Sequence, residues 1–134
     1  MNLIKRTSAG VLICLLLYGC GFFVAAAKKV SEYCPGLNLK LNGVSIITNN
    51  GRKMTIVAYE DSYQKKVDAY VSDKANGFAA DNPRKYLDLK DDDNSVVADG
   101  DSILTKSVEG GGRNGTVIYN ATTRKIIIVE PKYQ

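Results

Sequence analysis

Residues 37–59 read LNLKLNGVSIITNNGRKMTIVAY, and this stretch decides the fold. Two Asn-Gly pairs, Asn42-Gly43 and Asn50-Gly51, interrupt apolar residues that tend to recur at every second position. Asn-Gly suits the two positive-φ positions of a type I′ turn, the commonest tight connection between antiparallel strands. The stretch therefore predicts a three-stranded antiparallel meander over residues 37–59.

The two predicted turns also fix which residues lie opposite one another. The second turn places Ile46 opposite Thr55 and Val44 opposite Val57, and the first places Leu41 opposite Val44. One face of the meander then collects Leu37, Leu39, Leu41, Val44, Ile46, Val57 and Tyr59, and the other collects Ile47, Met54 and Ile56. The strand over 52–59 is apolar on both faces, which predicts a central position in the sheet.

A helix is predicted directly after the meander. Asp61-Ser62 can cap its start, and Tyr63, Val67, Tyr70 and Val71 recur at helical spacing. Asn76-Gly77 supplies a left-handed stop, which ends the helix near residue 75. We expect the apolar stripe to pack against the sheet.

The remaining sequence predicts further strands. Residues 116–120 and 125–130 form a β-hairpin, whose Ile126–Val129 run is expected to be buried on both faces. Short strands are expected at 86–89 and 102–108, with Gly110–Gly112 in a hairpin loop. The fold class is therefore α+β, an antiparallel sheet of meander plus hairpin with one amphipathic helix. The same chain order also fits an OB-like barrel, the alternative architecture.

The N-terminal residues 1–27 have the composition of a signal peptide or membrane anchor. No charge occurs from Thr7 to Ala27, and Lys5 and Arg6 precede this run. As a helix, the 19 residues Ala9–Ala27 would be about 28 Å long, close to the roughly 30 Å of a hydrocarbon core. Residues 28–36 are then expected to be a linker, and residues 37–134 an exported domain.

Leu17-Tyr18-Gly19-Cys20 resembles the lipobox of bacterial lipoproteins. The resemblance implies diacylglyceryl transfer to the Cys20 thiol, cleavage before Cys20 and acylation of the new N-terminus. It also implies an outer-membrane address in a two-membrane bacterium, because Gly21 stands where the inner-membrane retention signal has Asp. Cys20 is therefore the predicted lipid-attachment residue.

Two other fates of this segment stay open. The run is long enough to remain as an uncut helical anchor. Ala25-Ala26-Ala27 also offers the small residues of an A-x-A cleavage site, which would release a chain beginning at Lys28. All three routes place residues 28–134 on the extracytoplasmic side of a membrane.

The cysteine usage limits covalent stabilisation of the exported part. Of the three cysteines, Cys14 and Cys20 lie in the apolar run and Cys34 alone follows it. No disulfide can therefore form within that part. Cys34 is a candidate for an intermolecular disulfide in an oxidising compartment, with an inert buried thiol as the alternative.

Composition also argues against several kinds of function. The chain has no His, so Ser-His and Cys-His catalysis is excluded and no catalytic residue is predicted. Asp91, Asp92, Asp93, Asp99 and Asp101 cluster in a polar stretch, but without EF-hand spacing, so neither a metal nor another cofactor is predicted. From Lys28 onward 16 basic residues face 14 acidic ones, and this small excess argues against nucleic acid.

These observations predict a small membrane-tethered protein of the cell envelope that acts by contact and is not an enzyme. Its partner would be another envelope protein or the cell wall, or, if a phage or plasmid encodes it, the receptor machinery of an incoming phage. A structural envelope lipoprotein without a specific ligand and a carboxylate-dependent hydrolase are the alternatives. An exposed apolar patch or sheet edge would favour the contact function.

Overall fold

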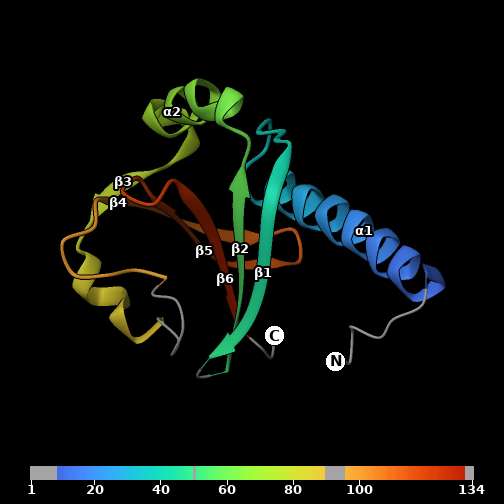
Figure 1. The fold of residues 1–134 in the computed structure, drawn as a ribbon. Helices are drawn as coiled ribbons and strands as arrows, with labels where there is room; N and C mark the ends of the chain where they lie inside the picture. The colour runs from blue at the N-terminus through green and yellow to red at the C-terminus, as the bar shows by residue number, and fades with distance from the viewer. Residues whose placement is uncertain (1–8, 50, 90–95, 132–134) are drawn as a thin grey trace.

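The computed structural model describes residues 9–49, 51–89 and 96–131, with the side chains of the first helix described from Gly21 onward. Six antiparallel strands form one sheet in the order β1-β2-β6-β5-β4-β3 (Figure 1). The elements are α1 (Ala9–Tyr33), β1 (Leu41–Asn49), β2 (Arg52–Tyr59), α2 (Gln64–Ser72), β3 (Ala79–Asp81), β4 (Ile103–Gly110), β5 (Arg113–Asn120) and β6 (Lys125–Pro131), with 3₁₀ turns η1 (Asp61–Tyr63), η2 (Lys74–Asn76) and η3 (Pro83–Leu89). The predicted α+β class with an antiparallel sheet is confirmed. The OB-like alternative is wrong, because β1 and β3 do not pair and the sheet stays open.

The hairpin predicted at Asn50-Gly51 is confirmed. Gly51 has a φ of +75°, and Val44 and Ile46 lie opposite Val57 and Thr55, as the turn chemistry requires. The strand that follows this turn, β2, pairs with β1 on one side and β6 on the other. Its predicted central position is therefore also confirmed.

The hairpin predicted at Asn42-Gly43 is wrong. Gly43 lies inside β1, beside an irregularity of register between Leu41 and Gly43, and is not among the described glycines with positive φ. Pairing of residues 41–43 with the end of β2 excludes a turn at the same place. Residues 37–40 are extended and bury Leu37 and Leu39, but they lie outside the sheet. Alternation therefore identified the extended segment and its buried side without identifying its partner.

The sheet is covered on both faces. On one face α1, α2 and residues 37–41 pack against side chains of β2, β5 and β6, including Val57, Val117, Ile126 and Ile128. On the other face, Leu89, Val96 and Val97 cover Met54, Ile103, Ile118, Ile127 and Val129. The prediction that Ile126–Val129 is buried on both faces is confirmed, since consecutive residues of β6 enter different clusters.

Helix α1 extends through most of the segment expected to be a linker. It continues to Tyr33, and Ala26, Val30 and Tyr33 are 5%, 0% and 3% exposed. These residues are spaced four and three apart, so they lie on one face of the helix. Residues 28–36 thus contribute to the core as helix and turn, rather than crossing solvent.

Two local predictions need correction in the middle of the chain. The helix expected over 61–75 is divided into η1, α2 and η2, and neither η1 nor α2 has a side-chain cap bond; Asp73 caps η2. Gly77, with φ +82°, ends this region as expected. The strand expected at 86–89 is wrong: these residues belong to η3, because Pro83 fixes a helix-compatible φ at its start.

The C-terminal strands agree with the sequence. The strand expected at 102–108 corresponds to β4, and β5 and β6 form the predicted hairpin. Gly111 and Gly112 connect β4 to β5 with φ +60° and +79°, and Gly110 pairs with Arg113. The glycine run is therefore a hairpin loop, as predicted. The strand β3, at the far edge of the sheet, was not predicted.

Candidate functional site

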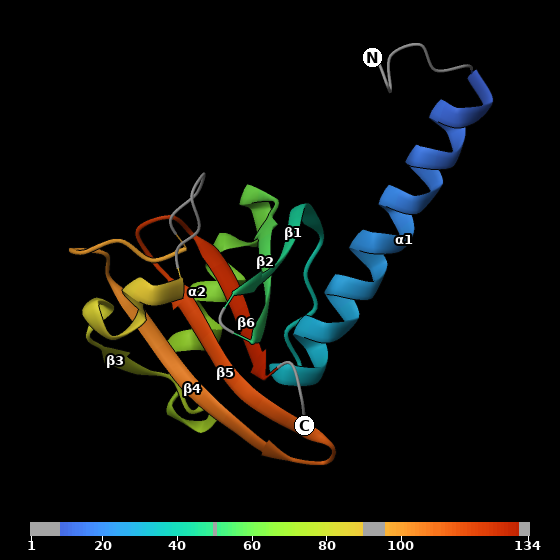
Figure 2. The ribbon, with the colours of Figure 1, turned by 90° about the horizontal axis from the view of Figure 1, so that it is seen from below.

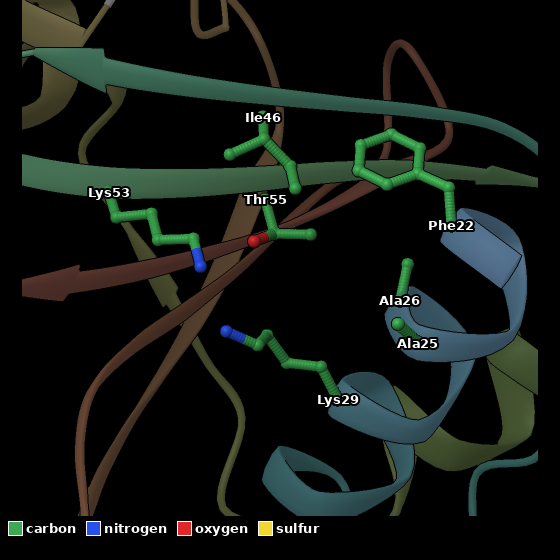
Figure 3. A pocket seen from close by; sticks show the side chains of 7 residues that line it. All are labelled: Phe22, Ala25, Ala26, Lys29, Ile46, Lys53 and Thr55. Atoms are coloured by element: carbon green, nitrogen blue, oxygen red, sulfur yellow. The ribbon is translucent and has the colours of Figure 1, made fainter. Parts of the chain in front are cut away.

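A small cavity lies between α1 and the helix-covered face of β1 and β2. Its volume is about 110 Å³. Figure 3 shows its lining: Phe22, Ala25, Ala26 and Lys29 from α1, Ile46 from β1, and Lys53 and Thr55 from β2. The lining residues of α1 precede those of the strands by at least 17 residues (Lys29 to Ile46), so the docking of α1 on the β1–β2 hairpin assembles the cavity.

Local geometry explains why these side chains meet. Lys53, Thr55 and Val57 alternate along β2 and therefore point to the same face, where α1 lies. Ile46 lies opposite Thr55 in β1 and shares that face. On α1, Ala26 and Lys29 are three residues apart and lie on neighbouring positions of one helix side.

Thr55 is the unusual residue of this cavity. It is 1% exposed, and its Oγ1 forms no hydrogen bond with any described residue. A buried hydroxyl without a partner costs about 1–3 kcal/mol, so such atoms are rare in folded proteins. Figure 3 shows this oxygen facing the space toward which Lys29 and Lys53 also point.

The two lysines differ in their pairing. Lys29 Nζ donates to Glu130 Oε1 at 2.6 Å, and Tyr33 donates to Glu130 Oε2 at 3.0 Å. Burial raises the pKa of Glu130, but the bonds from Lys29 and Tyr33 outweigh it and hold the pKa below its ordinary value. Burial and the bond to Glu130 raise the pKa of Tyr33 to about 12. Lys53 pairs in register with Glu130, and no described carboxylate oxygen lies within 4.0 Å of its ammonium.

This arrangement is suited to binding a group that accepts hydrogen bonds. An ammonium group and a hydroxyl donate hydrogen bonds, and the side chains of Phe22, Ala25 and Ile46 offer apolar contact. A threonine nucleophile needs a base to take its proton. Among the described lining residues no carboxylate or imidazole is present.

The outer edge of β1 is a second candidate surface. The strand is nine residues long, contains neither charge nor proline, and pairs only with β2 among the described strands. Ser45, Ile46 and Thr48 are exposed, and Ile46 is 44% exposed. Open edges of this kind present unpaired backbone groups to other chains, and natural proteins usually protect them with charge or proline.

Of the two cysteines predicted as sites, Cys20 belongs to α1 and Cys34 directly follows that helix. The backbone of Cys20 lies in α1, and its side chain lies outside the described part. Cys34 is fully buried, and burial raises the pKa of its thiol to about 11, which lowers its thiolate content at neutral pH. An intermolecular disulfide stays a prediction, and it would require this thiol to leave the core.

The acidic stretch is only partly described. Asp91, Asp92 and Asp93 lie outside the described residues. Asp99 pairs with Arg84 at 2.9 Å, and Asp101 accepts hydrogen bonds from Ala98 N–H and the Asn120 amide. Within residues 9–49, 51–89 and 96–131, no three Asp, Glu or Cys side chains form a group suited to a metal ion.

Sequence reasoning did not find Lys29, Lys53 or Thr55. A signal was present for the last two, because the predicted register places both polar residues on a face otherwise assigned to apolar ones. For Lys29 nothing in the local sequence indicates which element it meets.

Over the part of the chain whose side chains are described, no helix is long and apolar enough to cross a membrane. Comparison with known proteins gave no match to a family model, a curated protein or a solved structure.

Proposed function

We propose that this chain is a small membrane-tethered protein of the cell envelope, with its domain on the extracytoplasmic side, that acts by binding a partner. The observation that carries the proposal is the change of surface along α1. Phe22, Phe23 and Val24 are 40%, 36% and 69% exposed, while Ala26 and Val30, only a few residues later, are buried.

Exposure of Phe22, Phe23 and Val24 to water is unfavourable, and contact with a membrane would remove this unfavourable exposure. They are three of the four large apolar side chains exposed in the described structure. They lie within the uncharged sequence run from Thr7 to Ala27. A contiguous apolar surface of this kind is typical of a protein or membrane contact.

The connection between tether and domain is a continuous helix. Figure 2 shows α1 passing from the sheet outward, and the helix has no break between Ala9 and Tyr33. Its last turn is bonded to the following residue, because Cys34 N–H donates to Val30 O at 2.7 Å. A membrane-anchored α1 would therefore hold the domain in a defined orientation, which a flexible linker would not.

The packing of α1 also bears on the three processing routes. Cleavage before Cys20, or no cleavage, keeps Phe22, Ala25 and Ala26 in the chain. Cleavage after Ala27 would remove all three, and with them the helix side of the cavity. The contacts of these residues therefore support a tether in preference to release.

The edge of β1 supports a contact function over a purely structural role. Protein partners often add an extended segment to an open sheet edge, where backbone hydrogen bonds give affinity. The uncharged length of β1 leaves that edge open to such a partner.

The test of the tether is mass spectrometry of the mature N-terminus in a bacterial host, combined with membrane fractionation. We expect a membrane-bound chain that begins at Cys20 and carries acyl mass. The Cys20→Ser variant should accumulate as precursor, whereas the control Cys14→Ser, in the same run, should be processed normally. Detection of an intact Met1 would show that an uncut helical anchor, and not a lipid, holds the chain at the membrane. Detection of a soluble chain beginning at Lys28 would contradict the tether.

A further inference from the structure

We infer that the cavity between α1 and β2 binds the phosphate group of an anionic phospholipid. The inference rests on the proposed function, because it takes α1 to lie at a membrane. The cavity is named here the Thr55 cavity, and its donors are the Thr55 hydroxyl and the ammonium groups of Lys29 and Lys53.

The unpartnered hydroxyl is the first argument for a ligand. Thr55 Oγ1 is buried, has no described partner and lies on the wall of a cavity with room for a small group. A ligand oxygen in that space would accept the hydrogen bond that the protein itself does not supply. Phosphate oxygens are strong acceptors, and bonds from charged donors to them are stronger than neutral ones.

The charge balance is the second argument. Lys29 and Glu130 form a pair, and Tyr33 supplies a further hydrogen bond to the Glu130 carboxylate. Lys29, Lys53 and Glu130 together therefore carry one positive charge in excess. An ammonium has three donors, so Lys29 keeps two beyond its bond to Glu130. A monoanionic phosphodiester would balance this excess.

The apolar surroundings favour a lipid over free phosphate. A volume of about 110 Å³ holds a headgroup phosphate but not acyl chains. Phe22 lines the cavity (Figure 3), and its sequence neighbours Phe23 and Val24 are also exposed on α1. Acyl chains would extend along this surface toward the membrane that α1 enters.

The experiment uses the full-length chain in uncharged detergent micelles and follows the NMR signals of the Thr55 amide and the Ile46 methyl groups. Three probes are titrated: dihexanoyl phosphatidylglycerol, dihexanoyl phosphatidylcholine and inorganic phosphate. We expect saturable shifts with phosphatidylglycerol and at least tenfold weaker binding of the other two. Thr55→Val and Lys53→Gln should each weaken binding of phosphatidylglycerol by about tenfold or more.

Two controls separate the site from folding and from the tether. Thr55→Val removes an unpaired buried hydroxyl without changing shape, so its stability should equal or exceed that of the wild type. Lys125→Gln, an exposed residue of β6, should bind like the wild type. Unchanged binding in Thr55→Val, equal binding of both lipids, or binding of inorganic phosphate alone would overturn the inference. Membrane association of Thr55→Val is unaffected in each case, so failure here is distinct from failure of the tether.

Discussion

β1 and β3 are the two edges of one sheet, and they differ in length, charge and cover. β1 has nine residues without a charge, and no described strand pairs with its outer side. The irregularity of register at Gly43 disturbs only its beginning, so pairing with β2 is regular from Val44 to Asn49. Helix α1 lies beside this edge (Figures 1 and 2).

β3 is protected by several features at once. It has three residues and ends at Asp81, shortly before Pro83. Asp81 accepts hydrogen bonds from Tyr86 at 2.8 Å, Lys85 at 3.2 Å and Thr105 at 3.2 Å. Where β4 extends beyond β3, it carries Lys106 and Glu109. Short strands and edge charges are the usual devices against unwanted pairing.

The difference indicates that the sheet has one closed side and one side available for binding. The open edge lies on the same side as the Thr55 cavity and the exposed part of α1. Both candidate surfaces therefore lie next to the proposed tether, and the protected edge is the one formed by β3.

The largest effect is expected from Leu37→Ala, which tests whether the segment joining α1 to β1 belongs to the core. Leu37 is 1% exposed, so its truncation should lower the free energy of unfolding by about 2–5 kcal/mol. The neighbouring exposed Asn38→Ala is the control and should stay within about 0.5 kcal/mol. Urea denaturation of the full chain in detergent measures both. Equal denaturation midpoints for the two variants would show that the segment between α1 and β1 does not belong to the core.

The two Asn-Gly glycines provide the next test. Gly51→Ala should cost about 1–2 kcal/mol, because Gly51 has a φ of +75° that residues with a Cβ rarely adopt. Gly43→Ala is the matched control, since its new Cβ would lie 3.5 Å from Ala58 Cβ, an ordinary contact. Its stability should change by less than about 0.5 kcal/mol. Thermal unfolding that ranks the variants in the opposite order would contradict the assignment of the turns.

At the closed edge, Asp81 should show a low pKa. The hydrogen bond from Tyr86, followed by that from Asn82 N–H, lowers the pKa of Asp81 to about 2, against an ordinary value of 3.8. Its contribution to stability is therefore complete above pH 3.8 and is lost as the pH falls through about 2. In Tyr86→Phe the carboxyl should titrate closer to 3.8. If NMR titration gives the same midpoint for Asp81 in both proteins, Tyr86 is not the main cause of the lowered pKa.

The smallest effect on stability, and a clear effect on contact, is expected from Ser45→Lys. The lysine at this exposed position would give β1 an edge charge like those of β4. The free energy of unfolding should change by less than about 0.5 kcal/mol. A photocrosslinking residue at Thr48 should form an adduct in cells, and Ser45→Lys should abolish it. Ala80→Lys, on β3, is the control and should leave it intact. Loss of the adduct in both variants would show that the two edges do not differ in the proposed way.

Turn chemistry predicted the sheet only where it agreed with long-range pairing. The Asn42-Gly43 and Asn50-Gly51 signals are locally the same, but residues 41–43 pair with the end of β2 and cannot also form a turn. Burial of Leu37, Leu39 and Leu41 was predicted correctly from alternation, because burial follows the side-chain period whichever element covers it.

The candidate site was harder to predict than the fold. Ala26, Val30 and Tyr33 carry a helical stripe that could have extended α1 through the supposed linker. The meeting of Lys29 with Thr55 depends on where that helix docks, and no local pattern encodes docking. The alternation of residues 86–89 predicts a strand, but these residues belong to η3, which starts at Pro83, a residue whose fixed φ suits the first turn of a helix.

The central claim is that α1 enters a membrane beside the open edge while the closed edge remains in water. The chain has no Trp, so a single introduced tryptophan is an unambiguous reporter. The measurement is fluorescence of full-length Val24→Trp and Ala80→Trp in vesicles containing brominated acyl chains. The account predicts blue-shifted emission and strong quenching at position 24, with neither at position 80. Equal emission and equal quenching at the two positions would contradict it.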